Sequence, residues 1–223
     1  MIGRCSCILL SILAAVSGMP RRSTRSTVPS WHLPCGEEIE MELATIENFE
    51  EEVKSSLERL RLQHRLTMAD YLYRDYEYLY ERVRIGVHDH QYIPNWVPGK
   101  NDVNKIKRLV DAKPQMIAGH YPKMHTDLQK FAVAFEELVA DETNAEIRDA
   151  LATTQSYLTA MLCEVETNIV TLPALEMPTR VERSIMKSTD REPVDDTRRL
   201  VRDWGVLLKY RDYLHAWRHV FND

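Results

Sequence analysis

Four long segments of the chain carry apolar residues at steps of three and four, with few turn residues to interrupt them. This spacing places one apolar stripe along a helix. The 223 residues include only 7 glycines and 10 prolines. So few turn formers argue against an all-β sandwich or barrel, and against a doubly wound α/β fold. We therefore expect an all-α fold made of long helices.

The first stripe predicts one helix over about 38–83, with a bend near residues 64–70. Its members are Ile39, Leu43, Ile46, Phe49, Val53, Leu57, Leu60 and, less regularly, residues on to Val83. The alternation in Tyr71–Tyr80 would also suit a strand, but charges at helical spacing favour the helix. A short helix is expected over Asp102–Lys113, capped by Asn101 or Asp102 and stopped before Pro114.

Three further helices are expected at 123–140, at 144–171 and from a cap at Asp195 or Asp196 to the C-terminus. The link between the first two is short, so those helices must be antiparallel neighbours. The links 84–122 and 173–193 are each long enough to run the length of a bundle. The long, short, long order predicts an up-up-down-down, long-chain four-helix bundle with two crossovers.

The N-terminus reads as a secretory signal peptide over residues 1–17. Arg4 precedes a short apolar run, and Ala15 and Ser17 stand at the −3 and −1 positions of a cut after Ser17. The run is too short to span a membrane, and we expect no membrane insertion. The alternative is a buried or amphipathic N-terminal helix. We expect residues 18–35 to form a flexible segment, residues 36–223 to form the bundle, and the protein to be secreted.

Removal of the signal peptide would leave two of the four cysteines, Cys35 and Cys163. In an oxidising compartment a pair of cysteines suggests one disulfide; two free buried thiols are the alternative. A net charge of −5 argues against a nucleic-acid-binding role.

No sequence motif indicates catalysis or a bound cofactor. The chain lacks the Gly-x-Ser-x-Gly, phosphate-loop, His-Glu-x-x-His and calcium-loop patterns, so we expect a protein that is not an enzyme. His88 with His90, and His215 with His219, have the spacing of zinc ligands, but no Cys or Glu cluster completes either set. We expect neither a metal nor another cofactor.

The stretch Trp204–Phe221 resembles the last helix of the leukaemia inhibitory factor, oncostatin M and ciliary neurotrophic factor group of interleukin-6 type cytokines. The shared features are Gly205, the Leu207-Leu208-Lys209 step, the Tyr210-Arg211 pair and the terminal Val220-Phe221. In that group a cysteine just before the first helix is bridged to one in the third helix, and Cys35 and Cys163 occupy those positions.

The resemblance implies a monomeric ligand of class I cytokine receptors, one of them a shared signal-transducing subunit, that triggers JAK/STAT-type signalling. The family also uses a Phe-x-x-Lys pair at the start of its last helix, and the stretch Asp195–Asp203 contains no Phe. On this basis the candidate receptor contacts are Trp96, Arg198, Arg199, Arg202, Trp204 and Lys209. A second set lies off the apolar stripes of the first and third long helices, as a candidate paired-helix site for the shared subunit: Arg59, Gln63, Asp149 and Ser156.

Each candidate also has a plain structural interpretation. Trp204 suits the core, the three arginines suit a solvated polar face, and Trp96 suits a contact that fastens its loop to the bundle. An alternative function is a secreted helical carrier of small apolar ligands, with an enclosed pocket lined by leucines and the tyrosines of Tyr71–Tyr80. A secreted bundle without a receptor is the third hypothesis.

Overall fold

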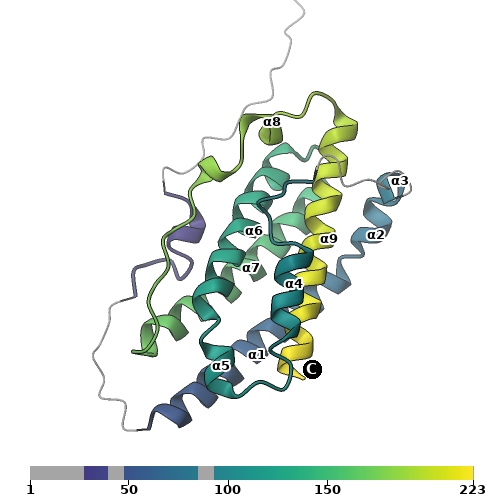
Figure 1. The fold of residues 1–223 in the computed structure, drawn as a ribbon. Coiled ribbons are helices and arrows are strands. Elements are labelled where there is room, and N and C mark those ends of the chain that lie inside the picture. Colours follow the sequence, from purple (N-terminus) through teal and green to yellow (C-terminus); the bar gives the residue numbers. More distant parts are fainter. Residues whose placement is uncertain (1–27, 40–47, 85–92, 223) are drawn as a thin grey trace, which may run out of the picture.

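The computed structural model describes residues 28–39, 48–84 and 93–222, and every regular element among them is a helix (Figure 1). The predicted all-α class is therefore confirmed for the described part of the chain. The predicted signal peptide, residues 1–17, lies outside the described residues, as do His88 and His90. The helices are η1 (Ser30–His32), α1 (Phe49–Tyr73), α2 (Tyr76–Leu79), α3 (Glu81–Arg84), α4 (Lys100–Lys107), α5 (Pro114–Ala118), α6 (Tyr121–Asp141), α7 (Ala145–Thr171), η2 (Arg183–Ile185), α8 (Ser188–Arg191) and α9 (Asp196–Phe221).

The single helix predicted over 38–83 is wrong at both ends. Residues 38–39 are not helical, and α1 begins at Phe49, where the Asn48 side chain accepts a hydrogen bond from a first-turn N–H. The helix continues unbroken through the predicted bend at 64–70 and ends at Tyr73. Asp75 then adopts a left-handed φ of 49°, which a right-handed helix cannot contain, so α2 and α3 follow as separate short turns.

The other long helices lie within two residues of their predicted bounds. Pro122 stands in the first turn of α6, and the Asn144 and Asp195 side chains cap α7 and α9. The short helix differs, because α4 is capped at Gly99 and ends at Lys107, six residues before the expected end. Pro114 opens another short helix, α5, whose first turn tolerates proline.

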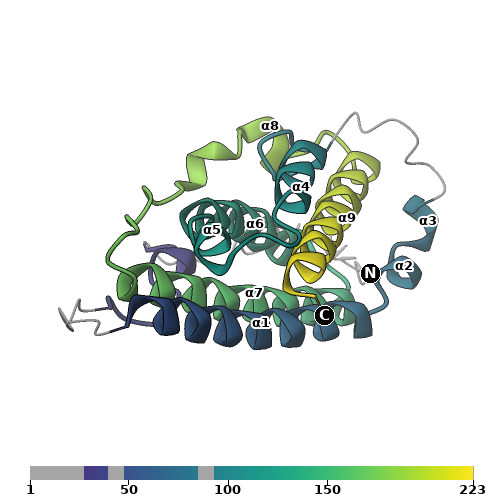
Figure 2. The same ribbon diagram turned by 60° about the horizontal axis from the view of Figure 1, so that its bottom comes forward.

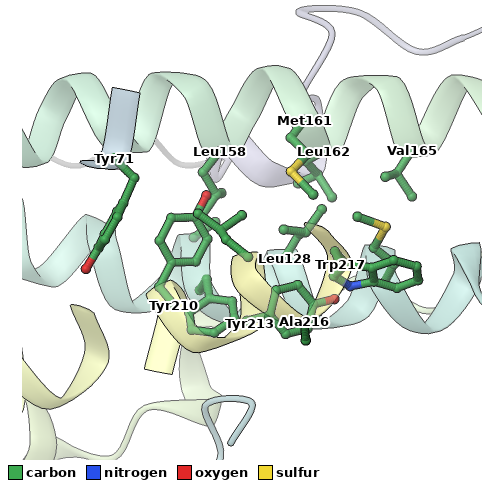
Figure 3. Packing of buried hydrophobic residues seen from close by; sticks show 14 of the residues in the cluster. Tyr71, Leu128, Leu158, Met161, Leu162, Val165, Tyr210, Tyr213, Ala216 and Trp217 are labelled. Carbon is green, nitrogen blue, oxygen red and sulfur yellow. The ribbon is translucent and has the colours of Figure 1, made fainter. Parts of the chain in front are cut away.

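The four long helices form a bundle in which α7 and α9 each pack against both α1 and α6. Helix α7 lies beside α1 on one side and α6 on the other, while α9 contacts α1, α4 and α6 (Figure 2). In the core, Leu158, Leu162 and Val165 of α7 face Tyr210, Tyr213 and Trp217 of α9 (Figure 3), and all six are fully or almost fully buried. Burial of each such large side chain contributes about 1.5–3 kcal/mol, so this contact is a main source of stability.

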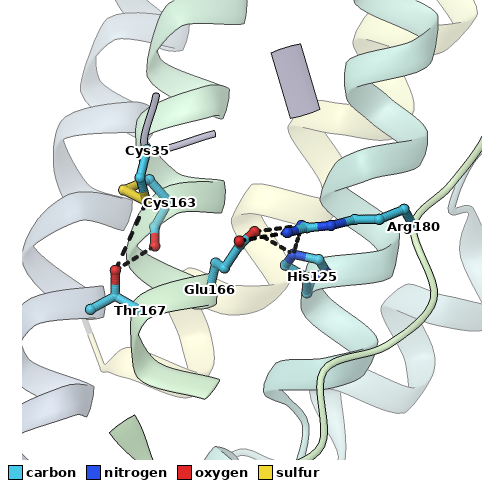
Figure 4. Close-up of a disulfide and its surroundings, with 6 residues drawn as sticks. All are labelled: Cys35, His125, Cys163, Glu166, Thr167 and Arg180. Atoms are coloured by element: carbon cyan, nitrogen blue, oxygen red, sulfur yellow. Dashed lines mark hydrogen bonds and ion pairs between the residues drawn. A yellow bond between two sulfur atoms is a disulfide. The ribbon is translucent and has the colours of Figure 1, made fainter. Parts of the chain in front are cut away.

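A disulfide joins Cys35 to Cys163 of α7, as predicted (Figure 4). It fastens a segment that also inserts Trp31 into the protein, with no exposed surface left on that side chain. The indole Nε1 donates to the carbonyl of Val181 at 2.8 Å, and the Arg183 guanidinium lies over the ring at 5.4 Å. The expectation of a flexible segment over 18–35 is therefore wrong for Trp31–Cys35, because a buried indole and a covalent bond hold it in place.

Candidate functional site

A hollow of about 610 Å³ lies near the start of α9 and is called here the end hollow. Its walls come from the loop before α4, from α8 and the residues that flank it, and from the first turns of α9. The lining residues are Ile93, Pro94, Asn95, Trp96, Lys187, Thr189, Asp190, Glu192, Pro193, Val194, Arg198 and Arg202. Trp96 is half-buried there and donates from its indole Nε1 to Asp190 Oδ2 at 3.3 Å. Trp96 thus fastens its loop to the bundle and also forms part of an open surface.

The arginines of α9 do not share one polar face. The Arg198 side chain is 43% exposed at the rim of the end hollow, with a long ion pair to Asp195 at 3.6 Å. Arg202 is instead 2% exposed, and its NH2 group lies 3.0 Å from Asp141 Oδ2. The expected solvated position of Arg202 is therefore wrong, because Asp141 of α6 and the neighbouring Asp203 of α9 pair with it in the interior.

The Arg199 and Trp204 side chains also point into the interior of the protein. Arg199 NH1 lies 3.5 Å from Asp203 and 3.7 Å from Glu142. Burial raises the pKa of Asp203 to about 6, against the opposing effect of Arg202 and Arg199. Trp204 is 3% exposed and stacks on Tyr80, so its core interpretation is confirmed.

The four residues expected on a helix pair do lie on two neighbouring helices, α1 and α7. Arg59 of α1 donates to Glu164 at 3.3 Å and to Asn168 at 3.1 Å, both on α7. Gln63 is half-buried one turn further along, with a weak hydrogen bond to Thr67. Asp149 and Ser156 are exposed on α7.

The sequence interpretation missed an exposed apolar row on α1, which we call the α1 row: Leu62, Leu66 and Tyr73, which are 54%, 48% and 82% exposed. Steps of four and seven residues place them on one side of the helix. Leu66 follows Arg59 by seven residues, so the row borders the seam with α7. The spacing is visible in the sequence, but the row lies off the buried stripe that predicts the helix.

Lys209 lies apart from the end hollow, in a groove between α4 and α9, where its Nζ donates to the carbonyl of Pro94 at 2.6 Å. His215 and His219 line the same groove. Among the residues that the structure describes, no group of three or more His, Cys, Asp or Glu side chains is placed to hold a metal ion. Within the same residues, no helix combines the length and apolar character that crossing a membrane requires.

A buried ionic cluster ties the link after α7 to the bundle (Figure 4). Arg180 donates to both oxygens of Glu166 at 2.5 and 2.6 Å, and His125 Nε2 lies 3.1 Å from the same carboxylate. Burial alone would raise the pKa of Glu166, but the hydrogen bonds from Arg180 and His125 outweigh it and lower the pKa to about 2. His125 and Glu166 are buried and the Arg180 side chain is 27% exposed. The three groups are paired with one another, so we assign the cluster to stability.

Comparison of the chain with known proteins identified no relative. No protein-family model, curated protein or solved structure matches the chain.

Proposed function

We propose that the protein is a secreted four-helix cytokine that binds class I receptors at the cell surface and triggers JAK/STAT-type signalling. The observation that carries the proposal is the end hollow, where the half-buried Trp96 meets the exposed Arg198 and Val194, which is 83% exposed. Tryptophan and arginine dominate the binding energy of protein interfaces, especially around a preformed hollow. The end hollow is thus the proposed contact for the specific receptor.

The arrangement of the long helices supports an up-up-down-down bundle. In Figure 1, α1 and α6 both ascend from the end where α5 lies, and α7 and α9 both descend toward it. The segments between α1 and α6 and between α7 and α9 are long, and the one between α6 and α7 is short. Such connections are those of the cytokine arrangement.

A second proposed face consists of the α1 row with the seam beside α7. Three large apolar side chains in one exposed row are unusual on a protein without a partner, whereas scattered ones are common. Arg59, Gln63, Asp149 and Ser156 supply polar groups on the same pair of helices. We assign this face to the shared signal-transducing subunit, separate from the end hollow.

The test is phosphorylation of signal-dependent transcription factors in receptor-bearing cells treated with the purified protein. Trp96→Ala with Arg198→Ala should reduce potency about tenfold or more, as should Leu66→Ser with Tyr73→Ala. The exposed Lys54→Ala on α1 is the control and should keep full potency. Silence across a panel of such cells would refute the proposal.

A second candidate function, a carrier of small apolar ligands, is favoured by one observation. The groove between α4 and α9 measures about 1000 Å³, the upper end of the range for small-molecule pockets. Leucines such as Leu72 and Leu208 line it.

A further inference from the structure

The groove between α4 and α9 has an apolar floor. The residues that supply it come from α1, the loop before α4, α4 itself and α9: Leu72, Ile93, Val103, Leu208 and Ala216. Leu72 is 49% exposed, so part of the floor is open to solvent. Exposure of apolar surface to water is unfavourable. An apolar ligand that covers this floor would therefore be stabilised by roughly 25 cal/mol for each Å² that it removes from water.

Gly205 allows Ile93, in the loop before α4, to pack closely against α9 at the floor of the groove. A Cβ atom at that position would come within 2.3 Å of the Ile93 side chain. Because glycine lacks that atom, Ile93 packs directly on the backbone of α9, and both residues line the groove. The resulting surface is continuous between the loop and the helix.

The rim of the groove is positively charged, in a chain whose net charge is −5. It carries Lys100, Lys107, Lys209 and Arg211 against only Glu77 and Asp212. Arg211 already pairs with both carboxylates, at 3.0 and 3.3 Å. Four cations and two carboxylates leave the described lining of the groove with a net charge of +2, His counted as neutral.

The individual lysines bear this out. Among the described residues, the ammonium of Lys209 donates to the carbonyls of Pro94 and Val97. Burial lowers its pKa, against the opposing effect of Asp102. Lys100 and Lys107 are exposed on the same side of α4 and form no ion pair within the described part of the chain. An anion in the groove would meet three lysines.

We propose that this groove binds a single-chain anionic amphiphile, such as a long-chain carboxylate. Its hydrocarbon chain would lie on the Leu72–Leu208 floor, and its head group would contact the rim lysines. A sulfated glycan would use the lysines but leave the floor uncovered. An acidic protein segment would meet the rim lysines, but its polar backbone would not match the apolar floor. The inference does not depend on the proposed receptor role.

The first test is calorimetric titration of the purified, disulfide-intact protein with palmitate, kept below the concentration at which it forms micelles. Octanoate should bind more weakly, by roughly two- to fourfold for each methylene lost from the floor. Hexadecanol, which keeps the chain and lacks the charge, should bind at least about tenfold more weakly than palmitate. Equal binding of the alcohol and the acid, or binding only of micelles, would overturn the proposal.

The second test uses matched pairs of exposed residues. Leu72→Ser should weaken palmitate binding about fivefold, while Leu66→Ser, an equally exposed leucine of α1 outside the groove, should not. Lys107→Gln should weaken it about fivefold, while Lys105→Gln on the same helix should not. Failure of either pair to separate would refute the site. Binding of heparin or an acidic peptide without palmitate binding would show a polyanion surface instead.

Discussion

At the scale of single residues, buried and half-buried ion pairs tie the segment after α7 and the start of α9 to α6 and α7. Arg180 and Arg183, whose side chains are 27% and 23% exposed, pair with Glu166 and Glu136. The buried Arg202 pairs with Asp141. A buried ion pair adds little over an apolar contact, but loss of one partner leaves an uncompensated charge, which is costly. Such pairs are therefore sensitive positions even though they are not the main source of stability.

Arg180→Met tests this at Glu166. Its carboxylate would lose both hydrogen bonds from the guanidinium, and the free energy of unfolding should fall by about 3 kcal/mol at pH 7. The depressed pKa of Glu166 means that its stabilisation is complete above the ordinary value of 4.5 and is lost as the pH falls toward 2. In the variant this pKa rises, so stability near neutral pH is lower and falls less steeply in acid. Urea titrations between pH 7 and pH 2 measure both; Arg198→Met, at an exposed arginine, should keep the wild-type pH dependence.

Gly205→Ala tests the close contact with Ile93. In an exposed helix this change would stabilise by about 1 kcal/mol, but here the added methyl group collides with Ile93. We expect a net loss of about 1–3 kcal/mol. Combination with Ile93→Ala removes the collision, so the double variant should be more stable than the sum of the single changes predicts. Additive effects in chemical denaturation would contradict the contact.

At the scale of the helices, local signals determined what could be predicted. Pro122, Asn144 and Asp195 stand at helix starts and act within one turn, and α6, α7 and α9 begin within two residues of the expected positions. The end of α1 has no such mark, because an aspartate in the left-handed region looks like any other aspartate in a helical pattern. The short helices after it could not be separated from the stripe for the same reason.

The same distinction between local signals and distant partners separates the candidate receptor contacts. Arg198 and Trp96 line the end hollow, and their role as receptor contacts stays a prediction. Arg202 is buried instead, because the carboxylate of Asp141 that pairs with it is distant in the sequence and is brought close only by folding. The groove was missed because its floor combines residues from four elements.

Asp75→Gly tests the break after α1. Glycine adopts the left-handed conformation without the steric cost that aspartate bears, so the free energy of unfolding should rise by about 0.5–1 kcal/mol. Ser156→Gly, at an exposed position inside α7, should instead lower it by about 0.5–1 kcal/mol. Thermal unfolding of the two variants should therefore shift in opposite directions. A shared downward shift would place Asp75 within a regular helix.

At the scale of the whole molecule, the Cys35–Cys163 disulfide closes a loop with a sequence separation of 128 residues. Replacement of both cysteines by serine should lower the free energy of unfolding by about 3–5 kcal/mol, since the unfolded chain gains the freedom that the bond removes. Hydrogen exchange should show the loss of protection first around Trp31, while the interior of α9 remains protected. Unchanged stability after full reduction, checked by mass spectrometry, would contradict this expectation.

The four tryptophans differ in their access to water, and this gives the protein an internal optical reporter. Trp31, Trp204 and Trp217 are each at most 3% exposed, whereas Trp96 is half-buried in the end hollow. A soluble quencher such as iodide should therefore dim mainly the emission of Trp96. A partner seated in the hollow would shield that one fluorophore, so its docking can be followed on the unlabelled protein.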